Sequence, residues 1–196
     1  APWASLIRVV IAEDFREDKL KKNLKQINTK TIGGSNVLHF AVVGGNVRTI
    51  NFIIHSFLEK GLNIDSSNTY GETPLHWACK EGTPQIVELL LKYGADPSVV
   101  DGEGSTPLHW AVDYDLIEIA QVLINHGANT NARNHDNLTP LLVSIQNESI
   151  NCIELLGGTP LPPQSPIQTK KEKRKVKKQQ STESLLSTLR TLFRVQ

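Results

Sequence analysis

The chain has 196 residues, 39% of them hydrophobic and 21% charged, and its formal net charge is only +1. This length suits one domain with an appendage, and no apolar run in the sequence is long enough to span a bilayer. No secretory signal is visible, and the two cysteines, Cys79 and Cys152, fall in different segments. We therefore expect a reduced, intracellular protein, in the cytoplasm, the nucleus or both.

The first 34 residues carry a weak two-helix pattern. Lysines give this segment a solvated outer side, as the end of a stacked array requires. We therefore expect residues 1–34 to form a degenerate N-terminal capping unit. Its apolar positions are Leu6, Val9, Val10 and Ile11 in one helix and Leu20, Leu24 and Ile27 in the other.

A tetrapeptide then returns at a fixed period. Thr-Pro-Leu-His at residues 73–76 recurs 33 residues later, and Thr-Pro-Leu-Leu follows after another 33 residues. Such a period indicates stacked copies of one supersecondary unit, which favours binding over catalysis. We place the units at residues 35–67, 68–100, 101–133 and 134–158.

Each unit has the pattern of two antiparallel helices followed by a loop. Thr73 stands where an N-cap residue is expected, and Pro74 follows at the first helical position. The second helix has one apolar face and ends at Gly94, which is placed as a left-handed C-terminal cap. The pattern predicts an all-α solenoid of about five helix–turn–helix units with projecting loops.

The outer units depart from this pattern. Asn36 takes the place of the threonine but lies 37 residues before Thr73, so four extra residues fall in the second helix. Four residues make about one helical turn, and we expect a longer helix there. In the last unit Asn137 replaces the glycine of the loop, and the second helix stops about one turn early at residues 157–158. We expect this unit to be the C-terminal cap.

Charge is divided unevenly along the chain. Residues 159–196 hold nine Lys or Arg against two Glu, a formal charge of +7, whereas the preceding residues hold 12 against 18, a formal charge of −6. Residues 159–180 are Pro-rich and basic, which predicts an extended linker. Residues 181–196 predict a short amphipathic helix. This helix either covers the end of the stack, or binds a partner or a membrane surface.

The basic run in the linker has three interpretations. It is a solvated spacer, a nuclear import signal, or a contact for nucleic acid or an acidic membrane. No aromatic residue interleaves with the lysines, which argues against specific nucleic-acid binding. The opposite charges of the two parts leave two alternatives open: the tail docks on the acidic body, or it stays mobile because exposed charges attract weakly. The run consists of Lys170, Lys171, Lys173, Arg174, Lys175, Lys177 and Lys178.

The repeated motif resembles that of ankyrin repeats over residues 35–156. It reads Gly-Glu-Thr-Pro-Leu-His-Trp-Ala at residues 71–78 and Gly-Ser-Thr-Pro-Leu-His-Trp-Ala at residues 104–111. The resemblance implies that the threonines cap the first helices. It also implies that His76 and His109 form hydrogen bonds between neighbouring repeats.

The resemblance further implies where a partner binds, because ankyrin repeats use their loop tips and the concave face of their first helices. Acidic residues and tyrosines occur at these positions, and tyrosine is a typical interface anchor. They predict a basic or Arg-bearing protein or peptide as the partner; the alternative is that the charges only confer solubility. The predicted binding residues are Tyr70, Glu72, Lys80, Glu81, Glu103, Asp113, Tyr114, His135 and Asp136.

Trp77 and Trp110 stand where leucine is usual in the family. They either pack between helices and loop or help to recognise a peptide, as in the similar ankyrin arrays of DHHC-type palmitoyltransferases. The chain has no Asp-His-His-Cys motif, so that activity is not implied. The main expectation is an adaptor that binds a protein or peptide without catalysing a reaction. Two alternatives stay open: a recruiting fragment of a larger enzyme such as a palmitoyltransferase, and a nuclear regulator of transcription.

The sequence offers no pattern typical of catalysis or of a cofactor. It contains no Gly-rich phosphate loop, no Cys-x-x-Cys and no His-Glu-x-x-His. The histidines His39, His76 and His109 recur with the repeat, which favours structural hydrogen bonds over metal ligation. We expect a non-catalytic protein–protein interaction scaffold without metal or cofactor.

Overall fold

The computed structural model describes residues 4–11, 15–23, 25 and 27–158, and the helices in these segments come in pairs. The predictions for residues 159–196, including the basic run and the amphipathic helix, lie outside the described residues. No β-strand occurs in the described segments. The helices are α1 (Ala4–Ile11), α2 (Glu17–Asn23), α3 (Val37–Gly44), α4 (Val47–Glu59), α5 (Pro74–Glu81), α6 (Pro84–Lys92), α7 (Pro107–Asp113), α8 (Ile117–Asn125), α9 (Pro140–Gln146) and α10 (Ile150–Leu155).

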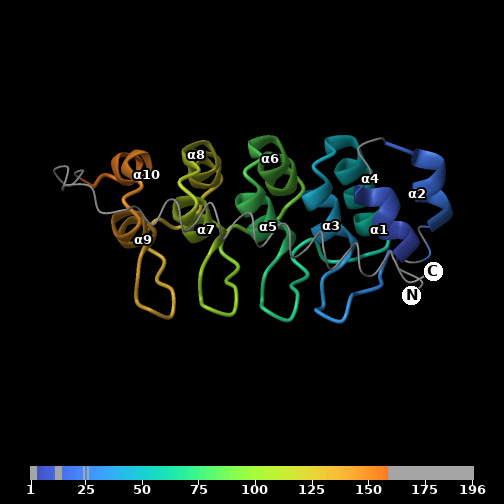
Figure 1. Ribbon diagram of the computed structural model, residues 1–196, viewed down its shortest axis with the longest axis horizontal. Helices are drawn as coiled ribbons and strands as arrows, with labels where there is room; N and C mark the ends of the chain where they lie inside the picture. The colour runs from blue at the N-terminus through green and yellow to red at the C-terminus, as the bar shows by residue number, and fades with distance from the viewer. Residues whose placement is uncertain (1–3, 12–14, 24, 26, 159–196) are drawn as a thin grey trace. The chain divides into compact units, whose positions relative to one another are not determined.

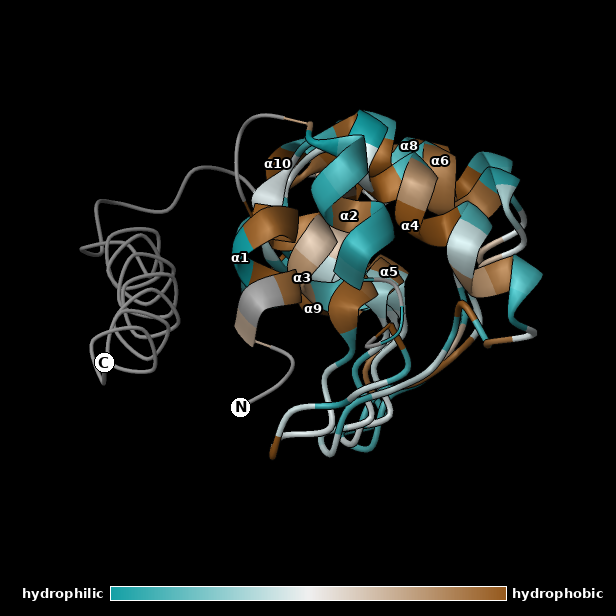
Figure 2. Ribbon diagram, turned by 90° about the vertical axis from the view of Figure 1, so that its right-hand side faces the viewer, coloured by the Kyte–Doolittle hydropathy of each residue, from teal (hydrophilic) through white to brown (hydrophobic). Residues whose placement is uncertain are grey.

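The pairs stack side by side in two rows (Figure 1). Helices α1, α3, α5, α7 and α9 form one row, and α4, α6, α8 and α10 pack on one another in the second. A loop projects on the same side before each of α3, α5, α7 and α9; we call these loops the first to fourth fingers, with tips at residues 32–34, 69–71, 102–104 and 135–137. Seen along the rows, the fingers overlap below the helices (Figure 2). The predicted all-α solenoid of five helix pairs is confirmed.

The first helix of each repeat begins where the tetrapeptide predicts. Asn36, Thr73, Thr106 and Thr139 are the N-cap residues of α3, α5, α7 and α9. The Thr139 hydroxyl accepts the Leu142 N–H at 3.3 Å, as expected of such a cap. At Thr106 the hydroxyl instead lies 2.8 Å from the Nδ1 atom of His109, so this threonine acts mainly through the histidine.

The second helix ends in the predicted glycine cap. Gly94 has a φ of 88°, a backbone conformation that residues other than glycine rarely adopt. Its N–H donates to the Leu91 carbonyl at 3.0 Å, and the Ala95 N–H donates to the Leu90 carbonyl at 3.0 Å. These two bonds are the Schellman arrangement that satisfies the last carbonyls of a helix.

Helix α4 contains the predicted extra turn. It has 13 residues, whereas α6 has 9. Two polar side chains on α4 also reach the next repeat: the Tyr93 hydroxyl donates to Oδ1 of Asn51 at 2.8 Å and lies 2.8 Å from Nε2 of His55. The lengthened helix thus contacts the C-terminal end of α6.

The two ends of the stack differ from its middle. Leu6, Val10 and Leu20 are buried as expected, but α2 stops at Asn23, so the buried Ile27 lies in a turn and not in the predicted helix. At the other end, α10 has only 6 residues. Leu142 occupies the position of the buried His109 and is 40% exposed, because no described repeat stacks beyond it. None of the described helices is both long and apolar enough to cross a membrane.

Candidate protein-binding face

Three buried histidines connect successive repeats. The Nε2 atoms of His39, His76 and His109 each lie 3.0 Å from a carbonyl oxygen of the next repeat, that of Glu72, Ser105 or Leu138. The Nδ1 atom of each ring accepts the N–H of its own N-cap residue, at 3.3, 3.2 and 3.1 Å. For His76 and His109, whose Nδ1 atoms also lie beside a threonine hydroxyl, this pattern assigns the neutral tautomer with the proton on Nε2. The expected structural hydrogen bonds between repeats are confirmed.

Burial also keeps these rings neutral. Desolvation lowers the pKa of His39 to about 4, and it lowers the pKa values of His76 and His109 as well. A charged imidazole in these positions would lose its water and gain only a carbonyl in return. The three rings are therefore fixed connectors that hold the fingers in register with the helices.

The second, third and fourth fingers are each shaped by one side chain that the motif analysis did not single out. The Oδ1 atom of Asp101 accepts two backbone N–H groups at 2.9 Å each, from Glu103 and Ser105. Asn68 and Asn134 do the same in the fingers before and after it. An Asn or Asp that recurs with the 33-residue period could have revealed these turns, since such side chains close turns on their own backbone.

The finger tips are joined to one another by backbone hydrogen bonds. In each case a backbone N–H of one tip donates to a backbone carbonyl of the tip before it. The bonds run from Thr69 to Gly33 at 3.0 Å, from Gly102 to Tyr70 at 2.7 Å and from His135 to Glu103 at 2.9 Å. A β-carbon on Gly71 would lie 2.7 Å from the nitrogen of Gly102, so this close approach requires glycine. The tips therefore form one rigid row.

The two tryptophans lie half-buried at equivalent positions of α5 and α7. Trp77 donates from Nε1 to Oε2 of Glu72 at 2.8 Å, and Trp110 donates to Oδ2 of Asp101 at 2.8 Å. Each ring also meets a histidine of the preceding repeat edge to face, with centroids 5.1 Å apart for His39 and 5.5 Å apart for His76. Each tryptophan thus packs against its neighbours and also keeps part of its ring exposed.

The structure divides the predicted acidic residues into two groups. Glu72 accepts from Trp77 and from Asn68 Nδ2, and Asp113 accepts from Asn147 Nδ2 at 2.8 Å. These two carboxylates therefore serve the protein itself. Glu103 and Asp136 instead lie exposed at the tips of the third and fourth fingers.

The other predicted binding residues also differ in exposure. Tyr70 is 70% exposed at the second finger tip, and His135 is exposed on the fourth, where its ring lies over Gly104. Lys80, Glu81 and Tyr114 are half-buried at the ends of α5 and α7 and have contacts within the protein.

Ile32 is an exposed residue that the sequence analysis missed. It stands at the first finger tip and is fully exposed, at 102%. An isolated isoleucine between a threonine and two glycines gives no periodic signal, so only the position of the finger makes it noticeable.

Reactive chemistry is not supported by the groups that the structure describes. Cys79 is completely buried, and burial raises the pKa of its thiol far above the ordinary value. Burial and the nearby Asp115 raise the pKa of Cys152 to about 12. Buried thiols of this kind are not nucleophiles. Among the described residues, no group of three or more His, Cys, Asp and Glu side chains could hold a metal ion.

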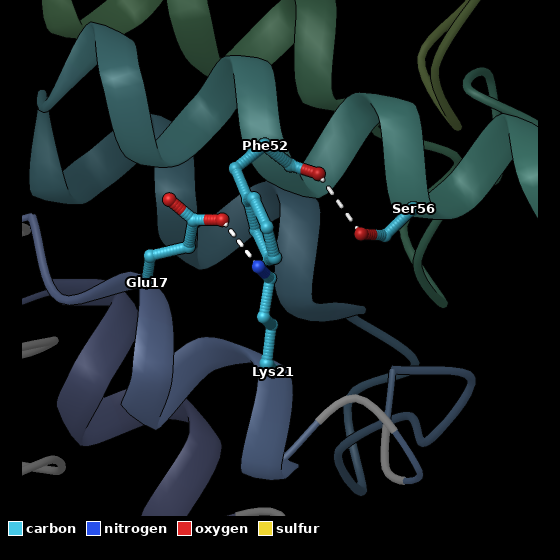
Figure 3. A network of polar contacts seen from close by, with 4 residues as sticks. All are labelled: Glu17, Lys21, Phe52 and Ser56. Atoms are coloured by element: carbon cyan, nitrogen blue, oxygen red, sulfur yellow. Dashed lines mark hydrogen bonds and ion pairs between the residues drawn. The ribbon is translucent and has the colours of Figure 1, made fainter.

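A shallow cleft lies between α2 and α4, apart from the fingers. Its volume is about 540 Å³, and Phe15 and Arg48 are among the residues that line it. Lys21 pairs with Glu17 at 2.6 Å beside Phe52, whose carbonyl accepts from the Ser56 hydroxyl at 3.0 Å (Figure 3). The hydrogen bond and charge of Glu17 raise the pKa of Lys21. This polar surface includes none of the residues predicted to bind a partner.

The sequence profile of ankyrin repeats (three copies) matches residues 9–101 and 94–160. The matches cover most of the chain, which therefore belongs to the ankyrin-repeat family. Ankyrin repeats are non-catalytic and bind other proteins, and stacks of this kind present extended concave surfaces for that purpose.

Among individual proteins, the chain is similar to several palmitoyltransferases. It is 38% identical to ZDHHC17 of Danio rerio over 68 residues, which is 34% of this chain and 10% of that enzyme. ZDHHC13 of Mus musculus gives the same values. AKR1 of Naumovozyma castellii is 41% identical over 69 residues, 35% of this chain and 9% of that enzyme. The match thus spans about a tenth of the length of these relatives.

Proposed function

We propose that this chain is a non-catalytic adaptor that binds a protein or peptide through its fingers and its inner helices, α5, α7 and α9. The observation that carries the proposal is the pair of half-buried tryptophans, Trp77 and Trp110. Each is held by a carboxylate and by ring contacts while part of it stays accessible. Aromatic side chains that are already fixed lose little entropy on binding, which makes them effective anchors.

The charges beside these anchors support a basic partner. Glu103 and Asp136 are exposed on consecutive finger tips, and the first 158 residues carry a formal charge of −6. An acidic surface accelerates the approach of a basic ligand and rejects acidic ones. Lys or Arg side chains in the partner would complement these two carboxylates.

Similarity to palmitoyltransferases favours one second candidate. In this alternative, the chain is the recruiting ankyrin array of a larger enzyme of that class. Sequencing the complete transcript tests it: a reading frame that continues into a catalytic domain supports the alternative, and a frame without one removes it.

Affinity capture with paired variants tests the adaptor function. The double variant Glu103→Lys with Asp113→Lys reverses two charges on the finger and inner-helix side, and circular dichroism checks that loss of the hydrogen bond from Asn147 to Asp113 leaves the chain folded. The matched control, Glu88→Lys with Glu118→Lys, makes the same change at exposed positions on α6 and α8. We expect quantitative mass spectrometry to find partners that the first variant loses and the control retains. Identical partner sets for the unmodified chain, the variant and the control would refute binding through this face.

A further inference from the structure

The four finger tips present different chemistry from one end of the row to the other. Ile32, on the first tip, is fully exposed, and Tyr70, on the second, is 70% exposed. Glu103 and Asp136 occupy the position of Tyr70 in the third and fourth fingers, one and two periods later, and both are exposed. The row is therefore apolar at its N-terminal end and acidic at its C-terminal end.

This row is held rigid before any partner arrives. Each tip from the second to the fourth donates a backbone hydrogen bond to the tip before it, between 2.7 and 3.0 Å. The side chains of Asn68, Asp101 and Asn134 fix the turns from within. A surface that is already ordered does not lose further conformational entropy on binding.

Two cations lie near the row, and they affect its polarity in opposite directions. Lys30, beside the first tip, donates from Nζ to the Ser67 carbonyl at 3.3 Å, so a basic ligand group is disfavoured at this end. Arg133 donates to the Asn137 carbonyl at 2.8 Å and weakens the acidic character of the fourth finger. Glu103 is therefore the strongest position for a cation along the row.

Resting on the proposed adaptor function, we propose that the finger row binds one extended peptide segment with apolar side chains at one end and Arg or Lys at the other. The apolar side chains cover Ile32 and Tyr70, and the cations meet Glu103 and then Asp136. Packed helices lie about 8–10 Å apart, and an extended chain advances about 3.3 Å per residue. Successive contacts are thus separated by about three residues, and the whole segment has about ten.

Selection from a random ten-residue peptide library displayed on phage, with the full chain as bait, tests this pattern. We expect enriched peptides in which apolar residues and Arg or Lys lie at opposite ends, spaced by about three residues. The affinity of the consensus peptide is then measured by calorimetry. Circular dichroism checks that each variant is folded, which exposed substitutions should not disturb.

Two tip variants and two controls separate the contributions. Ile32→Asp with Tyr70→Asp should weaken the consensus peptide about tenfold or more, because buried apolar contacts are lost. Glu103→Gln with Asp136→Asn should weaken it about threefold at low salt, and added salt should remove the difference. Leu58→Asp on α4 and Glu88→Gln on α6 change exposed residues outside the row and should have no effect.

The outcomes distinguish this inference from the adaptor function itself. Peptides that lose affinity with Tyr114→Ala on the inner helices but with neither tip variant would overturn the finger row and leave the adaptor function standing. Enriched peptides without the two-ended pattern would overturn the row as well. A selection that enriches nothing beyond the background of beads without protein would count against both.

Discussion

The histidine connectors lead to a sharp prediction about stability, best tested with His109→Leu. His109 donates to the Leu138 carbonyl at 3.0 Å and accepts the Thr106 N–H at 3.1 Å. Leucine can replace neither bond: the Thr106 N–H loses its partner, and the Leu138 carbonyl keeps only the hydrogen bond from the Asn134 N–H at 3.1 Å. An unsatisfied buried group costs about 1–3 kcal/mol and a lost hydrogen bond about 1 kcal/mol, so we expect the free energy of unfolding to fall by about 2–4 kcal/mol. Urea titration followed by circular dichroism measures this loss.

The same position in the last repeat provides the control. Leu142 is the equivalent of His109, but it is 40% exposed and has no described repeat beyond it. Leu142→His should therefore change the free energy of unfolding by less than about 1 kcal/mol. Equal effects of the two substitutions, or a neutral His109→Leu, would refute the argument that the histidine holds one repeat to the next.

Four other predictions concern stability and targeting. The pKa of His39 is lowered from 6.5 to about 4, so the unfolded chain takes up this proton first as the pH falls. Equilibrium unfolding at pH 7 and pH 5 should show a loss of about 2 kcal/mol from this group, and a pH-independent stability would contradict it. Glu148 has a φ of 56°, so Glu148→Gly should raise the melting temperature, while Glu154→Gly within α10 should lower it by the equivalent of about 1 kcal/mol. Leu108→Ala should cost about 2–5 kcal/mol in denaturant titration, because Leu108 is fully buried; a neutral result would exclude the proposed packing. Deleting residues 170–178 should abolish nuclear accumulation of a fluorescent fusion if the run is an import signal, and an unchanged distribution would favour the spacer.

Much of the fold could be predicted because its determinants are local and repeat at one period. The glycine position in the fourth finger is an example: Asn137 replaces glycine and still has a φ of 60°, which asparagine tolerates better than most residues. The extra turn of α4 likewise follows from counting four residues. The predicted end of α2 was wrong by several residues, because Ile27 is buried in a turn and not in a helix.

The candidate site was harder to predict, because exposure depends on contacts across a finger. Glu72 has the sequence context of a free surface carboxylate, yet it accepts hydrogen bonds from Trp77 and Asn68. Those partners are close only once the finger folds back onto α5. Conversely, nothing in the local sequence distinguishes Ile32 from a core isoleucine. The binding roles of the predicted residues therefore stay predictions.

The backbone acceptors of the histidine connectors have a consequence for how such arrays change in length. His39, His76 and His109 each meet the carbonyl oxygen of a different residue, namely Glu72, Ser105 and Leu138. Since a carbonyl is present whatever the side chain, one unit can follow another without a matching residue at the junction. Duplication or loss of a 33-residue segment therefore leaves the connectors between the remaining units intact, whereas the finger tips remain free to diverge.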